Sequence, residues 1–166
     1  MLHEGFYDDD SRHGEGKEYD RKGDIVYQGD YYRSYRSGIG KEYNHFGKII
    51  YDGEFKDGYR IGKGYGYLYD PRTGIIIYEG NLLNEKKNGK GKEFDRNGNQ
   101  IYEGEFTDGV RQGNGKQFDG YGNLIYDGCF RNGVRCGKGK EFSTSGEIIF
   151  SGDWKRGSKK FKAEMA

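Results

Sequence analysis

The sequence has little of what most globular domains use to build a thick aliphatic core. Only 32% of its 166 residues are hydrophobic, and it contains a single proline. Its mean hydropathy of −1.10 is in the range of many disordered chains. However, 16 tyrosines, 10 phenylalanines and 31 glycines argue against disorder. Rings that pack over glycines can form a thin layer, which favours a single twisted sheet.

Long apolar runs, cysteines and a strong net charge are also missing. No stretch approaches the roughly 18 residues of a membrane span, and the N-terminus has no apolar signal segment. The 28 Lys and Arg nearly balance the 27 Asp and Glu, so nothing implies global attraction to nucleic acid or membranes. Cys129 and Cys136 are too few for a secreted disulfide framework, and we interpret them as free thiols, with a disulfide or redox switch as the alternative. We expect an intracellular, cytoplasmic protein, with membrane or cytoskeleton association left open.

The sequence repeats with a period of 24 residues. The first glycines of successive units stand at positions 5, 29, 53, 80, 104, 128 and 152, so one step is 27 residues and the others are 24. A Gly-x-Gly pair begins nine residues after each of the first six glycines. The three extra residues of the long step fall within Tyr65–Thr73. Self-similarity at a fixed period is the signature of a repeat architecture.

Each unit predicts a β-hairpin. Along 102–106, rings and acids alternate with period two, which puts Tyr102, Gly104 and Phe106 on one face of a strand and the carboxylates on the other. Asp108-Gly109 predicts a tight turn, and the chain resumes as a second strand over 113–118. Successive hairpins are expected to continue as an antiparallel meander.

The predicted fold class is all-β: a single elongated, twisted antiparallel sheet, built as a β-hairpin solenoid with three aromatic columns. One unit buries too little apolar surface to fold alone, so neighbouring units must stack. The first column is Tyr27, Tyr51, Tyr78, Tyr102, Tyr126 and Phe150; the second is Tyr7, Tyr31, Phe55, Leu82, Phe106, Phe130 and Trp154; the third is Tyr19, Tyr43, Tyr67, Phe94, Phe118 and Phe142.

The array is predicted to cover residues 1–157 in about seven units, of which the first and last are incomplete. Residues 158–166 are predicted to form a C-terminal cap or tail. Within them, Lys159–Met165 is compatible with a short helix that covers the edge of the final strand.

The pattern Tyr-x-Gly-x-aromatic, then Gly-x-Gly-x-x-aromatic, then Gly resembles the MORN repeat (membrane occupation and recognition nexus) over nearly the whole chain. The departures are His3 and Leu82 at ring positions, and the missing Gly-x-Gly pair in the last unit. The resemblance implies a scaffold, a partner-binding adaptor or an elongated dimer, or a peripheral membrane protein. It also implies the alternative of an accessory segment of a lipid kinase or lysine methyltransferase, whose catalytic domain these residues do not supply.

No catalytic, cofactor or metal site is predicted. The three histidines form no metal-ligand spacing with the cysteines. The GxxxGK segments at 58–63 and 133–138 are one residue short of a phosphate loop, and the Gly-x-Gly pairs lack the third glycine of a dinucleotide fold. Carboxylates recur in every repeat, whereas a general acid or base needs one distinctive environment. We therefore expect a protein that is not an enzyme.

A cation stands seven residues after the first glycine of every unit. In one interpretation, each cation pairs with acids of a neighbouring unit or lies over a ring. In the other, the column binds an anionic ligand, either phosphoinositide headgroups or an acidic partner. The anionic-ligand candidates are Arg12, Arg36, Arg60, Lys87, Arg111 and Arg135, with Lys159 in the last unit.

The aromatic face is the second candidate surface, because an open sheet cannot cover every ring with its own strands and tyrosine is a favoured interface anchor. We expect a non-catalytic interaction or scaffold module that binds a helical or extended partner segment, or a second copy, through an aromatic groove. The alternative is peripheral binding of anionic phospholipid through the cation column. No nucleic-acid partner is expected. The partner-binding candidates are Tyr31, Phe55, Tyr102, Phe106, Tyr126, Phe130 and Trp154.

Overall fold

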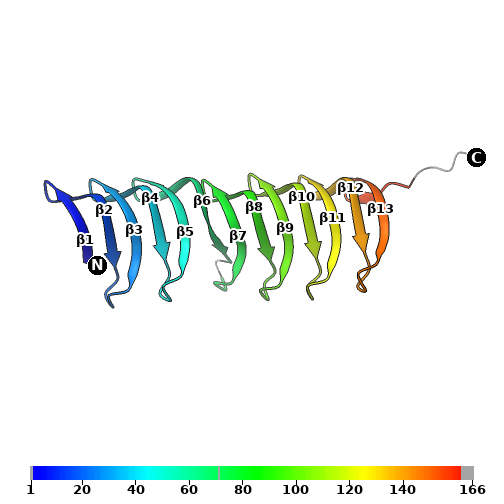
Figure 1. The fold of residues 1–166 in the computed structure, drawn as a ribbon, viewed down its shortest axis with the longest axis horizontal. Helices are drawn as coiled ribbons and strands as arrows, with labels where there is room; N and C mark the ends of the chain where they lie inside the picture. The colour runs from blue at the N-terminus through cyan, green and yellow to red at the C-terminus, as the bar shows by residue number, and fades with distance from the viewer. Residues whose placement is uncertain (1, 71, 162–166) are drawn as a thin grey trace, which may run out of the picture. The chain divides into compact units, whose positions relative to one another are not determined.

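The computed structural model describes residues 2–70 and 72–161. These residues form one antiparallel sheet in which each strand pairs with the next along the chain, as predicted, and they contain no helix (Figure 1). The strands are β1 (Leu2–Asp8), β2 (Ser11–Tyr19), β3 (Ile25–Tyr32), β4 (Tyr35–Tyr43), β5 (Ile49–Lys56), β6 (Tyr59–Tyr69), β7 (Ile76–Leu83), β8 (Lys86–Phe94), β9 (Gln100–Thr107), β10 (Val110–Phe118), β11 (Leu124–Arg131), β12 (Val134–Phe142), β13 (Ile148–Lys155) and β14 (Ser158–Lys159).

The chain divides into two compact units. Unit 1 comprises Met1–Tyr67 and Asn81–Lys86, and unit 2 comprises Leu68–Gly80 and Lys87–Ala166. Both are built from the same hairpin, so each is described by itself.

A two-residue turn joins the strands of each hairpin. Between β9 and β10, Asp108 and Gly109 have φ angles of 48° and 85°, and Thr107 faces Val110 across the turn. Two successive positive φ values define the turn type that matches the twist of the flanking strands, and Asp-Gly is a preferred sequence for it. The turn predicted at Asp108-Gly109 is confirmed.

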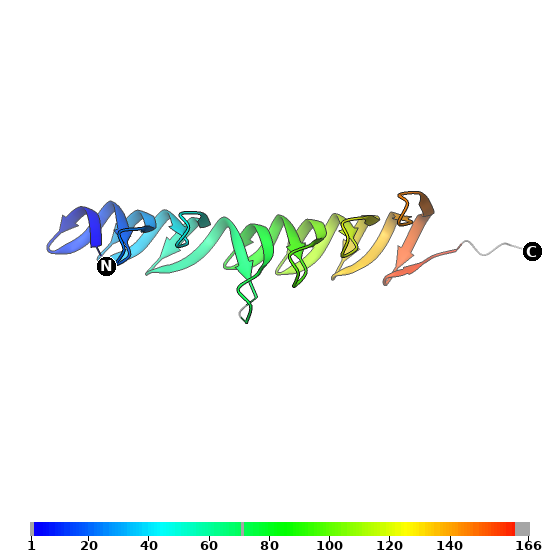
Figure 2. The same ribbon diagram turned by 90° about the horizontal axis from the view of Figure 1, so that it is seen from below.

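The connections between hairpins are closed by a polar side chain. In unit 2, the Asp95 carboxylate accepts hydrogen bonds from the backbone N–H groups of Asn97 and Asn99, at 2.8 and 2.9 Å. The connection between β6 and β7 is one residue longer than this loop (Figure 2). The other two residues of the 27-residue step lengthen β6, which has 11 residues where β8 has 9. The insertion predicted within Tyr65–Thr73 is therefore shared by a strand and its loop.

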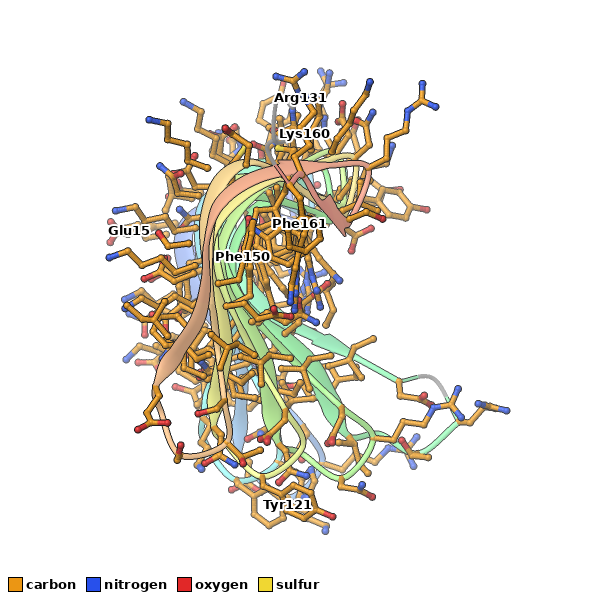
Figure 3. All side chains as sticks on the ribbon, turned by 90° about the vertical axis from the view of Figure 1, so that its right-hand side faces the viewer. Glu15, Tyr121, Arg131, Phe150, Lys160 and Phe161 are labelled. Atoms are coloured by element: carbon orange, nitrogen blue, oxygen red, sulfur yellow. The ribbon has the colours of Figure 1, made fainter. Side chains whose placement is uncertain are left out.

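The core lies on one side of the curved strands, which we call the inner face. The Tyr102 ring lies across Gly104 and Gly115, and a Cβ atom added at Gly115 would stand 2.5 Å from the Cζ atom of that ring. Tyr102 also packs edge-to-face against Phe106 and Phe130, with ring centroids 5.2 and 5.0 Å apart. Such contacts recur in both units, and the rings of the first two columns are almost completely buried, except for the exposed Tyr7 and the half-buried Phe150. Figure 3 shows Phe150 and Phe161 of unit 2 on the inner side of their curved strands. We call the opposite side of the strands the outer face.

The third aromatic column does not share this core. In β2, the Tyr19 hydroxyl donates a 2.8 Å hydrogen bond to Glu4, whose position precedes the core glycine Gly5 and therefore belongs to the outer face. Tyr43 lines an outer-face depression together with Lys41. The third-column rings are half-buried. Two columns rather than three therefore make the inner core.

The C-terminal end differs from the predicted helical cap. Ser158–Lys159 form strand β14, and the Lys160 N–H donates to the Asp153 carbonyl at 2.8 Å. Phe161 occupies the place that Gly137 has in the preceding hairpin, where φ is +51°, a conformation that a phenylalanine adopts only at a cost. The remainder of the predicted helix, 162–165, lies outside the described residues.

Candidate functional site

The predicted cation column lies on the inner face, above the buried rings. The guanidinium carbon of Arg36 is 4.5 Å from the centroid of the Tyr27 ring in unit 1. In unit 2, Arg111 stands at 4.4 Å over Tyr102. Both of these cations thus cover the first-column ring of their own hairpin, at a distance typical of a cation–π contact. Arg12 instead lies over Tyr31 of the next hairpin, 4.9 Å from the ring centroid.

A column of carboxylates alternates with these cations. Arg36 contacts Glu18 of the preceding hairpin at 3.3 Å and Glu42 of its own hairpin at 2.5 Å. Arg60 in turn pairs with Glu42, and Arg111 pairs with Glu93 at 2.6 Å. We call the two columns together the ion-pair ladder. Its cations are Arg12, Arg36, Arg60, Lys87, Arg111, Arg135 and Lys159, and its carboxylates are Glu18, Glu42, Glu93 and Glu141.

Sequence reasoning missed the carboxylate half of the ladder. Its members stand 13 residues after the first glycine of their units, at positions 18, 42, 93 and 141. This constant offset within the 24-residue period is the sequence signal from which the carboxylate column could have been found. A carboxylate meets the cation of the next hairpin 18 residues later in the chain, so the pairing follows from the strand register. The first interpretation of the cation column expects each cation to pair with an acid of a neighbouring unit or to lie over a ring. Both kinds of contact are present.

The ladder is more exposed on the inner face than the seven rings predicted to bind a partner. The cation side chains are 16–31% exposed and the carboxylate side chains 7–20%. The seven aromatic residues predicted to bind a partner are exposed by 5% or less. A ligand on this face therefore contacts ladder groups before it contacts those rings. The binding role of the rings, and that of the cations toward an anion, stay predictions.

The ladder is interrupted at one place in each unit. In unit 1, the position that follows Arg60 in the carboxylate column holds Gly66. In unit 2, that column holds Gln117, whose side-chain oxygen accepts from the Nε and Nη2 atoms of Arg135 at 3.1 and 3.0 Å. A neutral residue thus replaces a carboxylate beside Arg60, and again between Arg111 and Arg135.

The inner tyrosines stay neutral at physiological pH. Burial raises the pKa of Tyr102 and Tyr126 to about 12. It also raises the pKa of Tyr27 and Tyr31. A phenol with so high a pKa does not act as a proton donor or acceptor near pH 7.

The outer face carries exposed charges of both signs. Lys41 pairs with Asp52 at 3.4 Å, and both side chains are more than 40% exposed. On β10, Lys116 faces the acids Glu103 and Asp127 across its two neighbouring strands. Within residues 2–70 and 72–161, no three His, Cys, Asp or Glu side chains are grouped to hold a metal ion. No helix in this described part is long and apolar enough to cross a membrane.

A family model of the MORN repeat matches residues 3–25, 51–65, 78–100, 102–120 and 126–148, which together are more than half of the chain. The chain belongs to the MORN repeat family. MORN repeats commonly mediate interactions with proteins or membrane lipids, and proteins that carry them are generally non-catalytic scaffold modules. No curated protein matches the chain.

The MORN architecture also covers a segment that the family model leaves out. Residues 26–50 are unmatched, yet β3 and β4 there form the same hairpin, with Gly29 opposite Gly40 and the Tyr27 ring packed against both glycines. The 24-residue period thus identifies a MORN hairpin that the family pattern does not detect.

Proposed function

We propose that this MORN array is a non-catalytic interaction module whose inner face binds a helical or extended segment of another protein or of a second copy. The observation that carries the proposal is the ion-pair ladder, a row of partly exposed polar groups held in place over a buried aromatic floor. Groups fixed in this way lose little conformational entropy when a ligand binds.

The interruptions of the ladder favour an acidic partner segment. A guanidinium has five N–H donors and suits carboxylates that bind through two oxygens. Arg60, which lies beside Gly66, has a single ladder carboxylate, Glu42. Arg111, which lies beside Gln117, likewise has a single one, Glu93. A partner carboxylate at either place would complete the alternation of charges.

The buried rings have an indirect role in this proposal. Arg111 stands above Tyr102, so the ring fixes the height and direction of the guanidinium. Truncation of a ring would damage the fold and binding together. Variants of the ladder are therefore the sharper test of binding.

The proposal is tested by comparing two double variants in affinity capture from the cells that make the protein. Arg60→Gln with Arg111→Gln removes two inner charges, and Lys41→Gln with Lys116→Gln removes two outer charges as the matched control. Circular dichroism first establishes that both variants are folded. We expect the bound protein to be lost from the inner variant and retained by the outer one. Equal retention by both, or loss from the outer variant only, contradicts the proposal.

Binding of anionic phospholipid is the second candidate, because the ladder has seven cations and four carboxylates. Flotation with phosphatidylcholine vesicles that contain phosphatidylinositol 4,5-bisphosphate tests it. If the unmodified chain floats and Arg60→Glu, Arg111→Glu, Arg135→Glu does not, the lipid function replaces the protein-binding one. Absence of flotation, or flotation unchanged in the triple variant, excludes binding through the ladder.

A further inference from the structure

The two cysteines of the chain face each other across one hairpin. Cys129 on β11 and Cys136 on β12 are direct partners in the strand register, and both are free, partly exposed thiols. A strand residue has two cross-strand neighbours, so a second cysteine placed at random among the 166 residues would face the first roughly once in 80 cases. The arrangement is therefore unlike a chance occurrence.

The hairpins of unit 1 form without cysteines at the equivalent pair of facing positions. The equivalent pairs in unit 1 are Asp30 with Ser37 and Glu54 with Ile61. There the acid serves the backbone, since the Asp30 carboxylate accepts a 3.2 Å hydrogen bond from the Ile39 N–H. A cysteine forms only weak hydrogen bonds and cannot replace that acceptor well. Two positions that elsewhere hold unlike residues have thus both become cysteine in a single hairpin.

A bond between the two sulfurs needs only a small approach of the two facing strands. Directly opposed residues of an antiparallel pair have Cβ atoms about 4.5–5.5 Å apart, and disulfides need about 3.5–4.5 Å. The register shifts between Gly128 and Cys129, which leaves the pair beside an irregular rung that can adjust. Only the short turn at Asn132 and Gly133 separates the two strands at this end.

We propose that Cys129 and Cys136 are a thiol–disulfide exchange site, at which a low-molecular-weight disulfide such as oxidised glutathione converts the two thiols into an intrachain disulfide. One cysteine thiolate attacks a glutathione sulfur, which forms a mixed disulfide and releases one glutathione thiolate. The second cysteine then attacks the protein sulfur of the mixed disulfide and releases the second glutathione. Two protein thiols are oxidised, one glutathione disulfide is reduced to two thiols, and the two protein protons pass to the released thiolates.

The environment of the pair gives the two cysteines different roles. Burial, followed by the hydrogen bond with Cys129, raises the pKa of Cys136 to about 11. Cys136 is thus a poor first nucleophile at neutral pH, and Cys129 makes the first attack. Once Cys129 is in the mixed disulfide, it carries no thiolate charge and no longer opposes the ionisation of Cys136. Cys136 then ionises more easily and resolves the intermediate.

The test incubates the purified full chain with mixtures of reduced and oxidised glutathione and follows its intact mass after acid quenching. We expect a species about 2 Da lighter than the reduced chain, with no bound glutathione and no intermolecular dimer. In the matched control, Cys136→Ser should stop at the glutathione adduct of Cys129. The equilibrium constant for oxidation should be at least about tenfold larger in the folded chain than in urea, because a disulfide that fits the native geometry stabilises the fold.

Three results overturn the proposal. One is a stable glutathione adduct as the final product of the unmodified chain. Another is oxidation in urea but not under native conditions, which would mean that the folded hairpin keeps the sulfurs apart. The third is an equilibrium constant that is no larger in the folded chain, which would mean that the bond strains the hairpin.

Discussion

The guanidinium carbon of Arg36 lies 4.5 Å from the centroid of the Tyr27 ring, while its nitrogens bond to Glu18 and Glu42. One side chain therefore covers a buried ring and forms ion pairs with two hairpins. A column that the sequence presents as a basic stripe is, in the structure, partly neutralised by carboxylates and lies over the core. This relationship predicts that ladder residues contribute to stability as well as to binding.

Replacement of Arg36 by Ala should lower the free energy of unfolding by about 1–3 kcal/mol, because it removes the cation from Tyr27 and leaves Glu18, a buried carboxylate, with fewer partners. The matched control is Lys41→Ala, which breaks an exposed pair with Asp52 and should cost about 0.5 kcal/mol or less. Urea unfolding followed by circular dichroism measures both. Equal losses would mean that the ladder is an ordinary surface feature.

Replacement of Gly115 by Ala should lower the free energy of unfolding by at least about 2 kcal/mol, because a methyl group there would overlap with the Tyr102 ring. Gly120→Ala is the control, since the nearest atom to its added Cβ would be 3.8 Å away. That change should be neutral, or stabilising by up to about 1 kcal/mol. The fluorescence of Trp154, the single tryptophan, reports the urea unfolding of unit 2. If Gly115→Ala were as stable as Gly120→Ala, the ring could not lie across the glycine.

Replacement of Gln117 by Glu should restore the missing carboxylate between Arg111 and Arg135. We expect the midpoint of urea unfolding to rise at low salt by an amount equivalent to about 0.5–1 kcal/mol. The gain should shrink in 1 M salt, where charge interactions are screened. A stability that falls at low salt would show that desolvation of the new carboxylate outweighs its pairing.

Alkaline pH should destabilise the protein through its inner tyrosines. Burial raises the folded-state pKa of Tyr102 and Tyr126 to about 12, whereas the unfolded value is about 10. A raised folded pKa gives stability that is fully present below pH 10 and is lost as the pH rises toward 12. Unfolding free energies between pH 9 and 11.5 measure the slope, which should be shallower in Tyr102→Phe. An unchanged slope in this variant would argue that Tyr102 ionises equally in both states.

The hairpins and the core face could be predicted from local sequence. The alternation at Tyr102, Gly104 and Phe106, with Asp108-Gly109 as the turn, requires only the two-residue period of a strand and the φ preferences of the turn. The structure has the same rings on the inner face and the same turn. Here, local rules decide the geometry.

The ladder and the exposure of the rings could not be predicted in the same way. Glu93 meets Arg111 18 residues later in the chain, so its role depends on the register between hairpins. The burial of Tyr102 depends on Arg111 above it and on Phe130 from the next hairpin. The number of residues between Gly16 and Tyr19 decides on which face of β2 Tyr19 lies. Its contact with Glu4, however, can be identified only when β1 and β2 are paired. Long-range pairing decides these features.

The central claim is that the inner face binds the partner, and adjacent positions on β10 test it most directly. A photo-crosslinking amino acid such as benzoylphenylalanine is placed at Gln117, on the inner face beside Arg135, or at Lys116, on the outer face opposite Asp127. The two probes are one residue apart and point to opposite sides of the same strand. Irradiated in an extract of the cells that make the protein, the probe at Gln117 should crosslink the partner and the probe at Lys116 should not. Crosslinking from Lys116 alone, or equally from both positions, would contradict the account.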